Sequence, residues 1–311
     1  MRTLILRSLA SSLAVLLSAV FLYGCSGGAE PDPSMSGSST EKSFDATTVA
    51  LSEVLTFHAS FDRGVDADWA LGDRQVYTAP SYAEQDQAVP GIGNPSVEVA
   101  DGTGRFGHAL RFTARNQHAI FYKAEDNVAY SSEDWNGTVS FWLSLDPATD
   151  LEPGFCDPIQ ITDAAYNDAA IWVDFTGENP RQFRLGVFGD LDVWNPDGLS
   201  PDEHQGFLDR LLIISAPPFA TGQWTHVVIT YAGINTQNGG VANLYLDGER
   251  LPHVSDSIDE PFTWDRGRGA IRLGVNYVGL YDEVSLFSRA LTDEEVRALH
   301  VLEDGVAALH P

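Results

Sequence analysis

The feature of this sequence that most constrains the fold is an alternation of apolar and polar residues with a period of two. In the segment TVSFWLSL (138–145), valine, phenylalanine and leucine alternate with serine and tryptophan. Segments 224–231, 243–251, 270–275 and 281–287 follow the same pattern. A period of two places every second side chain on the same face of a strand. We therefore predict a series of short strands, each buried on one face.

Turn and helix signals fit an antiparallel arrangement of these strands. The dipeptide Asp-Gly at 247–248 is the strongest short signal for a hairpin turn. One helix is predicted after Thr292, because Thr292 and Glu295 have the spacing of a capping box and Leu291 with Val296 that of a hydrophobic staple. Short strands followed by one short C-terminal helix predict an all-β fold, an antiparallel sandwich of two sheets.

A glycine motif raises the alternative of a dinucleotide-binding fold. Gly102, Gly104 and Gly107 are spaced as G-x-G-x-x-G. Such a fold requires an amphipathic helix after the last glycine, whereas residues 108–114 (HALRFTA) alternate as a strand does. We therefore expect no nucleotide cofactor and interpret these glycines as turn residues at the entrance of a strand.

The N-terminus resembles a bacterial lipoprotein signal peptide, which would cover residues 1–24. Two arginines precede an uncharged stretch, Ser8–Tyr23, which is shorter than the roughly 18 residues that a spanning helix needs. The following LYGC resembles a lipobox, which implies cleavage after Gly24 and acylation of Cys25. The alternative is an ordinary secretory signal cut nearby.

Residues 25–50 are rich in Gly, Ser, Pro and Thr and are predicted to be a flexible stalk. Acyl chains on Cys25 would anchor the protein to the lipid bilayer. The expected location is therefore outside the cytoplasm of a bacterium, on the outer membrane or cell surface rather than the inner membrane.

Composition limits the architecture and the partners. With Cys25 acylated, Cys156 has no partner for a disulfide and is predicted to be a buried apolar residue. The chain is expected to form one domain over 51–302, followed by a tail at 303–311. The formal net charge of −26 repels phosphate, so no nucleic acid partner is expected.

Six segments resemble the successive signatures of laminin G-like domains, which belong to the concanavalin A-like lectin/glucanase superfamily. The resemblance implies a jelly-roll sandwich with adjacent first and last strands. Between about 146 and 220 the chain is longer than the family pattern, and we expect extra strands and long loops on the same sandwich. The six segments are 55–62, 104–112, 137–145, 222–231, 243–251 and 279–299.

The sequence lacks the paired catalytic glutamates that a glucanase of this superfamily would need. Glucanases of this superfamily carry two glutamates on one strand, whereas Glu249 and Glu283 have no such partner. His226 is expected to be structural. We therefore predict a non-catalytic, lectin-like domain that binds a carbohydrate or a surface protein. The alternatives are a structural envelope lipoprotein without a specific ligand and a glycan-active hydrolase.

Two loops combine a tryptophan with polar residues and are candidate ligand contacts, because a sugar stacks on an indole while its hydroxyls bind polar groups. The alternative is that each tryptophan pins its loop to the sandwich. The candidates are Trp194, Asn195 and Asp197 in the first loop, and Trp264, Asp265 and Arg266 in the second.

A structural calcium ion is also expected. Asp62 closes the predicted first strand and Asp282 opens the last one, so the family arrangement would bring both carboxylates together. Backbone oxygens of Gly104 and Gly107 could complete the set of oxygen ligands that calcium requires. The alternative is that both aspartates only accept backbone N–H bonds at turns.

Overall fold

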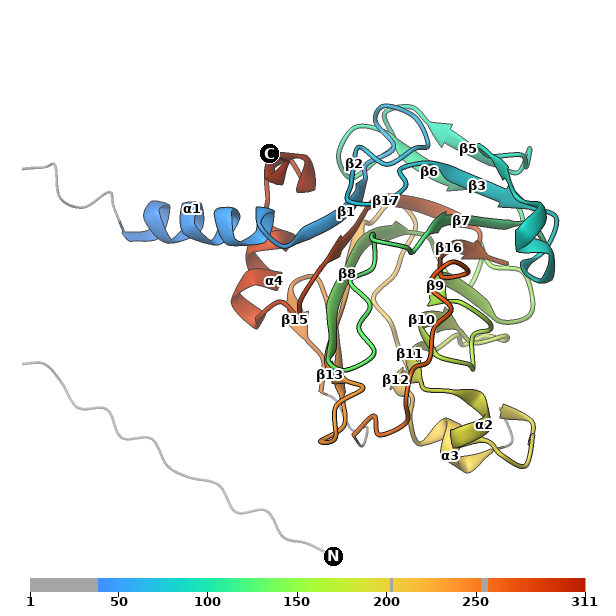
Figure 1. Cartoon of the computed structure of the whole chain (residues 1–311). Helices are drawn as coiled ribbons and strands as arrows, with labels where there is room; N and C mark the ends of the chain where they lie inside the picture. Colours follow the sequence, from blue (N-terminus) through green and yellow to red (C-terminus); the bar gives the residue numbers. More distant parts are fainter. Residues whose placement is uncertain (1–38, 202–203, 253–256, 311) are drawn as a thin grey trace, which may run out of the picture.

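The computed structural model describes residues 39–201, 204–252 and 257–310, with the side chains described from residue 46 onward. The predicted signal peptide, Cys25 and the first half of the predicted stalk lie outside the described residues. Two antiparallel sheets pack face to face and form the predicted sandwich (Figure 1). No helix among the described residues has the length and apolar character needed to cross a membrane.

Sheet A has nine strands, and seven of them follow the order β15-β14-β13-β8-β17-β1-β2, with β6 pairing β17 and β5 pairing β6. Strand β1 lies antiparallel to β17, so the first and last strands are neighbours as expected. The bounds are β1 (Leu55–Ala59), β2 (Trp69–Ala70), β5 (Val97–Ala100), β6 (Ala109–Phe112), β8 (Trp135–Ser144), β13 (Thr225–Ile234), β14 (Val241–Leu246), β15 (Glu249–Arg250) and β17 (Gly279–Phe287).

Sheet B has eight strands in the order β12-β11-β10-β9-β16-β7-β3-β4. Strands β9 to β12 come from the segment 146–220, which therefore extends the sandwich with additional strands. The bounds are β3 (Val76–Ala79), β4 (Val89–Pro90), β7 (Ala119–Lys123), β9 (Cys156–Thr162), β10 (Ala170–Phe175), β11 (Phe183–Phe188), β12 (Leu212–Ile214) and β16 (Ala270–Val275).

Short helices connect and flank the sheets. Helices α2 and α3 belong to the long loop between β11 and β12, while α4 and η3 end the chain. The bounds are α1 (Ser39–Ser52), η1 (Tyr82–Gln87), α2 (Leu191–Trp194), α3 (Gln205–Leu208), α4 (Asp293–His300) and η3 (Val306–Leu309).

The main core lies between the two sheets. Phe57 and Phe141 from sheet A meet Ile161 and Phe175 from sheet B, and all four side chains are fully buried. Cys156, at the start of β9, is 1% exposed and belongs to this core, which confirms the prediction that it is a buried apolar residue.

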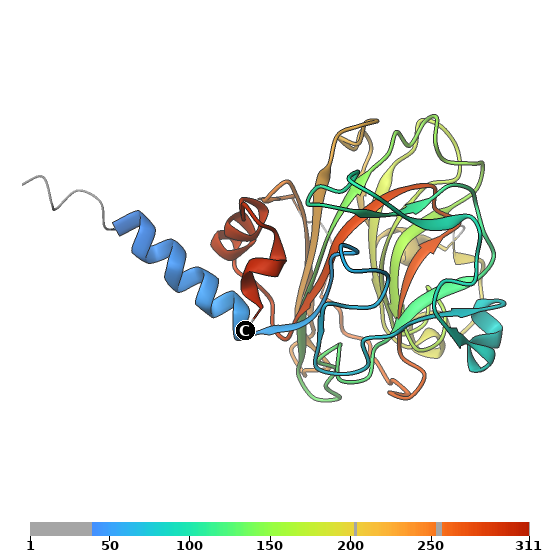
Figure 2. The ribbon, with the colours of Figure 1, turned by 90° about the horizontal axis from the view of Figure 1, so that it is seen from above.

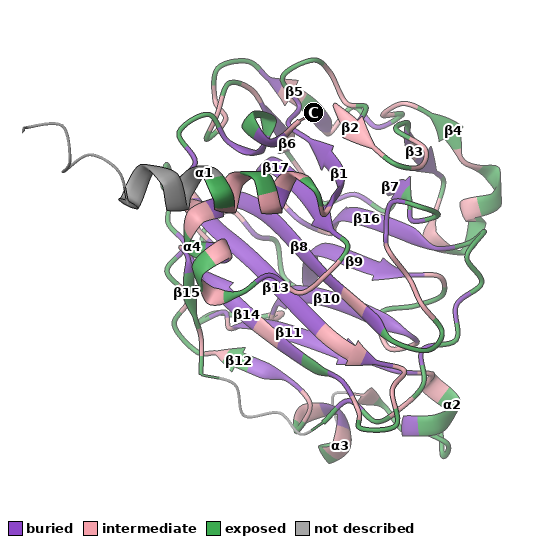
Figure 3. Cartoon of the chain, turned by 60° about the vertical axis from the view of Figure 1, so that its left-hand side comes forward, coloured by how far each residue is buried: buried purple, intermediate pink, exposed green. Residues whose placement is uncertain are grey.

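The central strands of sheet A, β8 and β17, are buried on both faces, whereas the alternation predicted burial of one face only (Figure 3). Helix α4 and η3 cover the outer face and form a second apolar cluster there, which includes Val228, Phe287 and Leu299. The capping box of α4 is present, since Thr292 accepts from the Glu295 N–H and Glu295 accepts from the Thr292 N–H.

Both ends of the predicted domain are more ordered than the sequence indicated. Helix α1 covers the last part of the segment predicted to be a flexible stalk and projects from the sandwich (Figure 2). Leu51, near the end of α1, is fully buried in the second cluster. In the predicted tail 303–311, Val306 and Leu309 are buried in the same cluster. These apolar side chains explain why the end of α1 and the C-terminal segment pack on the sandwich.

The three glycines of the G-x-G-x-x-G motif lie in the hairpin between β5 and β6, as the turn interpretation predicted. Gly107 has φ +62°, and a Cβ on it would lie 2.1 Å from Asp62 Oδ1. Only glycine fits there, because the backbone passes directly against the aspartate.

Candidate ligand-binding site

A pocket of about 230 Å³ lies on the outer face of sheet B, the face turned away from sheet A. Strands β9, β10, β11 and β16 supply its floor, and the loops that enter β9 and β10 supply its rim. We call it the outer-face pocket and define it by Phe155, Asp157, Gln160, Tyr166, Trp172, Asp174, Arg184 and Phe207.

The alternation along the strands places these side chains. In β10, Ile171, Val173 and Phe175 enter the main core, so Trp172 and Asp174 must point to the opposite face. On β11, Arg184 is paired in register with Asp174, and Gly186 is paired with Trp172.

Aromatic rings form the walls of the pocket. Trp172 is buried and stacks near Phe207 with ring centroids 6.3 Å apart, while Phe155 and Tyr166 are 41% and 39% exposed at the rim. The indole lies directly over Gly186, where a Cβ would be 2.2 Å from the ring. Trp172 Nε1 donates to the Tyr166 carbonyl at 2.5 Å, which holds the rim loop against the floor.

A buried ion pair crosses the floor. The Arg184 guanidinium binds Asp174 through two parallel hydrogen bonds of 2.8 and 2.5 Å. The same guanidinium lies 4.9 Å from the centre of the Phe155 ring and 5.9 Å from that of Trp172. Such a bidentate, stacked pair has a fixed geometry, so it gives the pocket a rigid polar floor.

A second carboxyl group, that of Asp157, lies beside this pair. Gln160 Nε2 donates to its Oδ2. Burial, and then the charge of Asp174, raise the pKa of Asp157 to about 8. The ionised form of this carboxyl group is therefore disfavoured, and its protonated form can donate one hydrogen bond.

The first predicted ligand loop lies on the same side of the molecule, but its tryptophan is interior. Trp194 is 6% exposed, packs on Phe188 and Phe207, and donates from Nε1 to the Asn167 carbonyl at 2.9 Å. Asn195 is also buried and binds Leu199 within the loop, whereas Asp197 is exposed. This arrangement corresponds to the alternative in which the tryptophan pins the loop.

The second predicted loop is arranged similarly. Trp264 is 8% exposed, belongs to the main core and donates to the Ala169 carbonyl at 2.7 Å. Asp265 caps its own turn by accepting from the Gly267 N–H, and Arg266 forms an exposed ion pair with Asp126. Neither indole presents a face to solvent, so the outer-face pocket replaces both loops as the candidate site.

Two of the three residues considered for catalysis are buried in contacts within the fold. His226 is 1% exposed and bonds Ser140 at 2.8 Å through Nε2. Glu283 is buried under the C-terminal segment, 3.2 Å from His58, and accepts from the Val306 N–H. Glu249 is exposed in the hairpin strand β15.

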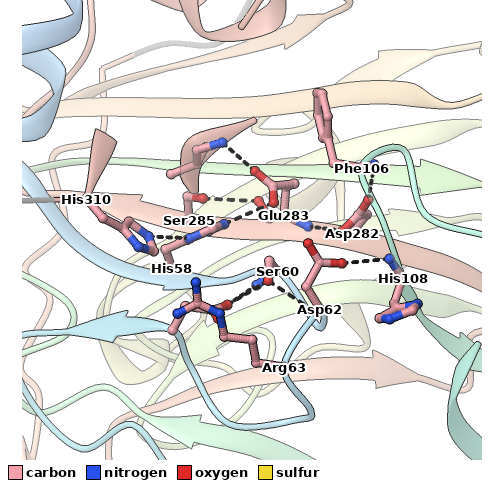
Figure 4. Close-up of polar contacts among 12 residues, drawn as sticks. His58, Ser60, Asp62, Arg63, Phe106, His108, Asp282, Glu283, Ser285 and His310 are labelled. Atoms are coloured by element: carbon pink, nitrogen blue, oxygen red, sulfur yellow. Dashed lines mark hydrogen bonds and ion pairs between the residues drawn. The ribbon is translucent and has the colours of Figure 1, made fainter. Parts of the chain in front are cut away.

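The two aspartates considered for calcium both reach the hairpin turn between β5 and β6 (Figure 4). Asp62 accepts from the His108 N–H at 2.7 Å, and Asp282 accepts from the Phe106 N–H at 2.9 Å. Within the described residues, no group of three or more His, Cys, Asp or Glu side chains is placed to hold a metal ion. The carboxylates thus act as turn acceptors, and calcium at this place stays a prediction.

The comparisons with known proteins agree with this architecture. A laminin G family model, described as the concanavalin A-like lectin/glucanases superfamily, matches residues 122–297, more than half of the chain. The chain belongs to this superfamily. No curated protein matches the sequence.

Solved structures of the superfamily fold are similar at low identity. Domain 4 of AbnA, an extracellular arabinanase of Geobacillus stearothermophilus solved with arabinotriose, is 18% identical with a TM-score of 0.46, over 78% of this chain and 97% of that chain. The binding domain of botulinum neurotoxin serotype D is 13% identical (TM-score 0.51), over 82% of this chain and 52% of that chain. The binding domain of botulinum neurotoxin DC, solved in complex with SialylT, is 9% identical with a TM-score of 0.50, over 80% of this chain and 52% of that chain. This chain therefore spans about half the length of these toxin domains.

Proposed function

We propose that this protein is an exported, lipid-anchored lipoprotein whose laminin G-type domain binds a glycan in the outer-face pocket without cleaving it. The observation that carries the proposal is the composition of the pocket: two half-exposed aromatic rings, Phe155 and Tyr166, stand over a buried polar floor. Sites for sugars and other small ligands combine apolar walls with a few fixed polar groups in this way.

The geometry suggests how a sugar would bind. One face of the ring would stack on Phe155 or Tyr166, which carry the apolar contact area. Hydroxyl groups would bond to Gln160, Asp157 and the Arg184–Asp174 pair at the floor. Because that pair is already rigid, little ordering of side chains would be needed on binding.

The proposed absence of catalysis rests on the state of the two carboxyl groups in the pocket. Retaining hydrolysis needs a free carboxylate nucleophile about 5–5.5 Å from an acid. Both carboxylate oxygens of Asp174 accept hydrogen bonds from the Arg184 guanidinium, so they are already engaged. A floor of this kind favours binding over bond cleavage.

Export and anchoring are supported by the sequence alone. The apolar stretch followed by LYGC resembles a lipoprotein signal, with Cys25 as the acylated residue. A glycan-binding domain on such an anchor would hold the cell, or a polysaccharide, at the envelope surface. A surface protein is the other class of partner, and a purely structural envelope role is the alternative without a ligand.

A glycan array probed with the purified full chain tests the proposal. We expect hits that Phe155→Ala or Tyr166→Ala weakens by about tenfold, the effect of losing a central aromatic contact. Leu71→Ala is the matched control, because Leu71 is 61% exposed and lies outside the pocket. An array without hits, or hits that neither pocket variant weakens, would contradict glycan binding in this pocket.

A further inference from the structure

The carboxyl group of Asp157 is buried in the outer-face pocket without a direct ion pair among the described residues. Asp157 is 8% exposed and lines the pocket at the start of β9. Only Gln160, a neutral amide, donates to it among the described residues, and no Lys, Arg or His there forms an ion pair with it. Asp174 beside it differs, because Arg184 neutralises it through two hydrogen bonds.

An unpaired buried carboxylate is unfavourable, because it loses water without gaining an opposite charge. Burial therefore favours the protonated form of the Asp157 carboxyl group and raises its pKa to about 8. A ligand that brings a positive charge to this carboxyl group would restore the ionised form. The buried Arg272 reaches Asp157 only through Gln160, whose Oε1 accepts from Arg272 Nη1 at 3.5 Å and whose Nε2 donates to Asp157, so a ligand ammonium would be the direct cationic partner that Asp157 lacks.

The walls of the pocket favour the same kind of group. A cation within about 6 Å of an aromatic ring is attracted by the negative face of the ring. Arg184 already makes such contacts, 4.9 Å from the centre of Phe155 and 5.9 Å from that of Trp172. Tyr166 and Phe207 present two more rings to the same space.

The charge of the whole chain points in the same direction. Asp and Glu number 44 against 18 Lys and Arg, for a formal net charge of −26. Such a field speeds the approach of cations and slows that of anions. The pocket and the rest of the chain therefore select for the same sign of ligand charge.

We propose that the glycan bound in the outer-face pocket carries a protonated amino group, as a hexosamine without its N-acetyl group does, and that Asp157 forms the ion pair with this ammonium. This inference rests on the proposed function and names the class of glycan. Stacking on Phe155 or Tyr166 would hold the sugar ring, while Asp157 would distinguish a free amine from an acetylated one.

The test compares two matched ligands on the full chain by calorimetric titration at pH 6: a glucosamine tetramer and an N-acetylglucosamine tetramer. We expect the glucosamine tetramer to bind at least tenfold more tightly, with a preference that falls as salt is added. Asp157→Asn keeps the shape and should reduce this preference to less than threefold. Glu249→Gln, on the exposed hairpin, is the matched control and should leave it unchanged.

The outcomes separate this inference from the proposed function. Equal binding of both tetramers, or a preference that Asp157→Asn does not reduce, would overturn the amino-sugar assignment and leave glycan binding intact. Spermidine tests the other source of the same charge: if it binds as tightly as the glucosamine tetramer, the amine alone is recognised and the assignment to a sugar fails. If neither tetramer nor any glycan on the array binds, the proposed function fails as well.

Discussion

At the scale of single residues, His226 shows how burial decides the role of a side chain. Its ring packs against those of Trp142 and His300, with centroids 4.6 and 5.5 Å away. Burial, and then the neighbouring His300, lower the pKa of His226 to about 3. A histidine that stays neutral in this way serves the packing of β13 under α4, because it can bond Ser140 without carrying a charge.

The lowered pKa predicts that stability falls with pH. The unfolded histidine takes up a proton below about pH 6.5, whereas the folded one does not until about pH 3, so the free energy of unfolding should decrease as pH falls through this range. The contribution of His226 between pH 7 and pH 5 is about 2 kcal/mol. Urea unfolding of wild type and His226→Gln at both pH values measures it, and equal pH dependence in the two proteins would refute this role.

Calcium at the β5–β6 turn is a second prediction at the residue scale. Burial raises the pKa of Asp282 to about 9 although its carboxyl group accepts from the Phe106 N–H, and a bound cation would stabilise the ionised form further. Calcium at a hundredfold excess over its Kd would stabilise the fold by about 2.7 kcal/mol, or roughly 5–10 °C in melting temperature.

Thermal melts with added calcium and with EDTA provide the measurement. Asp282→Ala should abolish the increment while leaving the domain folded. Asp101→Asn is the matched control in the same turn, since the Asp101 side chain is 90% exposed. A melting temperature indifferent to both additions would show that Asp62 and Asp282 serve the turn alone.

At the scale of elements, the C-terminal segment after α4 is fastened to β1 and β17 by polar and apolar contacts (Figure 4). Glu283 accepts from the Val306 N–H, and His58 Nδ1 lies 2.6 Å from His310 Nε2. Val306 and Leu309 are buried beside these bonds. The segment therefore belongs to the fold, although its sequence of nine residues gives no periodicity to predict this.

Removing residues 306–311 should lower the free energy of unfolding by about 3–6 kcal/mol, since two buried apolar side chains contribute roughly 1.5–3 kcal/mol each. Loss of the segment would also take the Val306 N–H from Glu283 and the His310 ring from His58, which adds to the cost. Ala308→Ser, at an exposed position, is the control and should change little. Denaturant unfolding of the full and truncated chains measures this difference. An unchanged denaturation midpoint in the truncated chain would show that the segment is only loosely attached.

The sequence predicted the strands, the capping box and the adjacency of the first and last strands, because these depend on local pattern or on order along the chain. It did not predict the outer-face pocket, whose lining runs from Phe155 to Asn276 and meets only when the strands pair. One signal was present: Asp174 and Arg184 stand in otherwise apolar strands at positions facing away from the core. The Trp194 and Trp264 loops were favoured instead, because burial of an indole depends on contacts distant in sequence.

At the scale of the whole molecule, the two faces of the sandwich have different uses. Helices α1 and α4 lie on the side of sheet A (Figure 2). The outer-face pocket lies on the face of sheet B that is turned away from sheet A. A chain that leaves the domain through α1 toward a membrane would therefore leave the pocket free to meet a ligand.

Anchoring gives the prediction at this scale. Cys25→Ala should prevent lipid modification and leave the chain soluble or uncleaved, since the acyl chains would be the only stable attachment. Metabolic labelling with a fatty acid, followed by membrane fractionation, checks this. Cys156→Ala serves as the control and should keep the label, whereas label that persists on Cys25→Ala would disprove acylation at this residue.

The most direct test of the account is a crystal structure of the protein soaked with the tightest glycan from the array. We predict density for a sugar ring stacked on Phe155 or Tyr166, with polar contacts to Asp157 and Gln160 on the floor of the outer-face pocket. Density for the glycan at the Trp194 or Trp264 loops, with an empty outer-face pocket, would contradict the account.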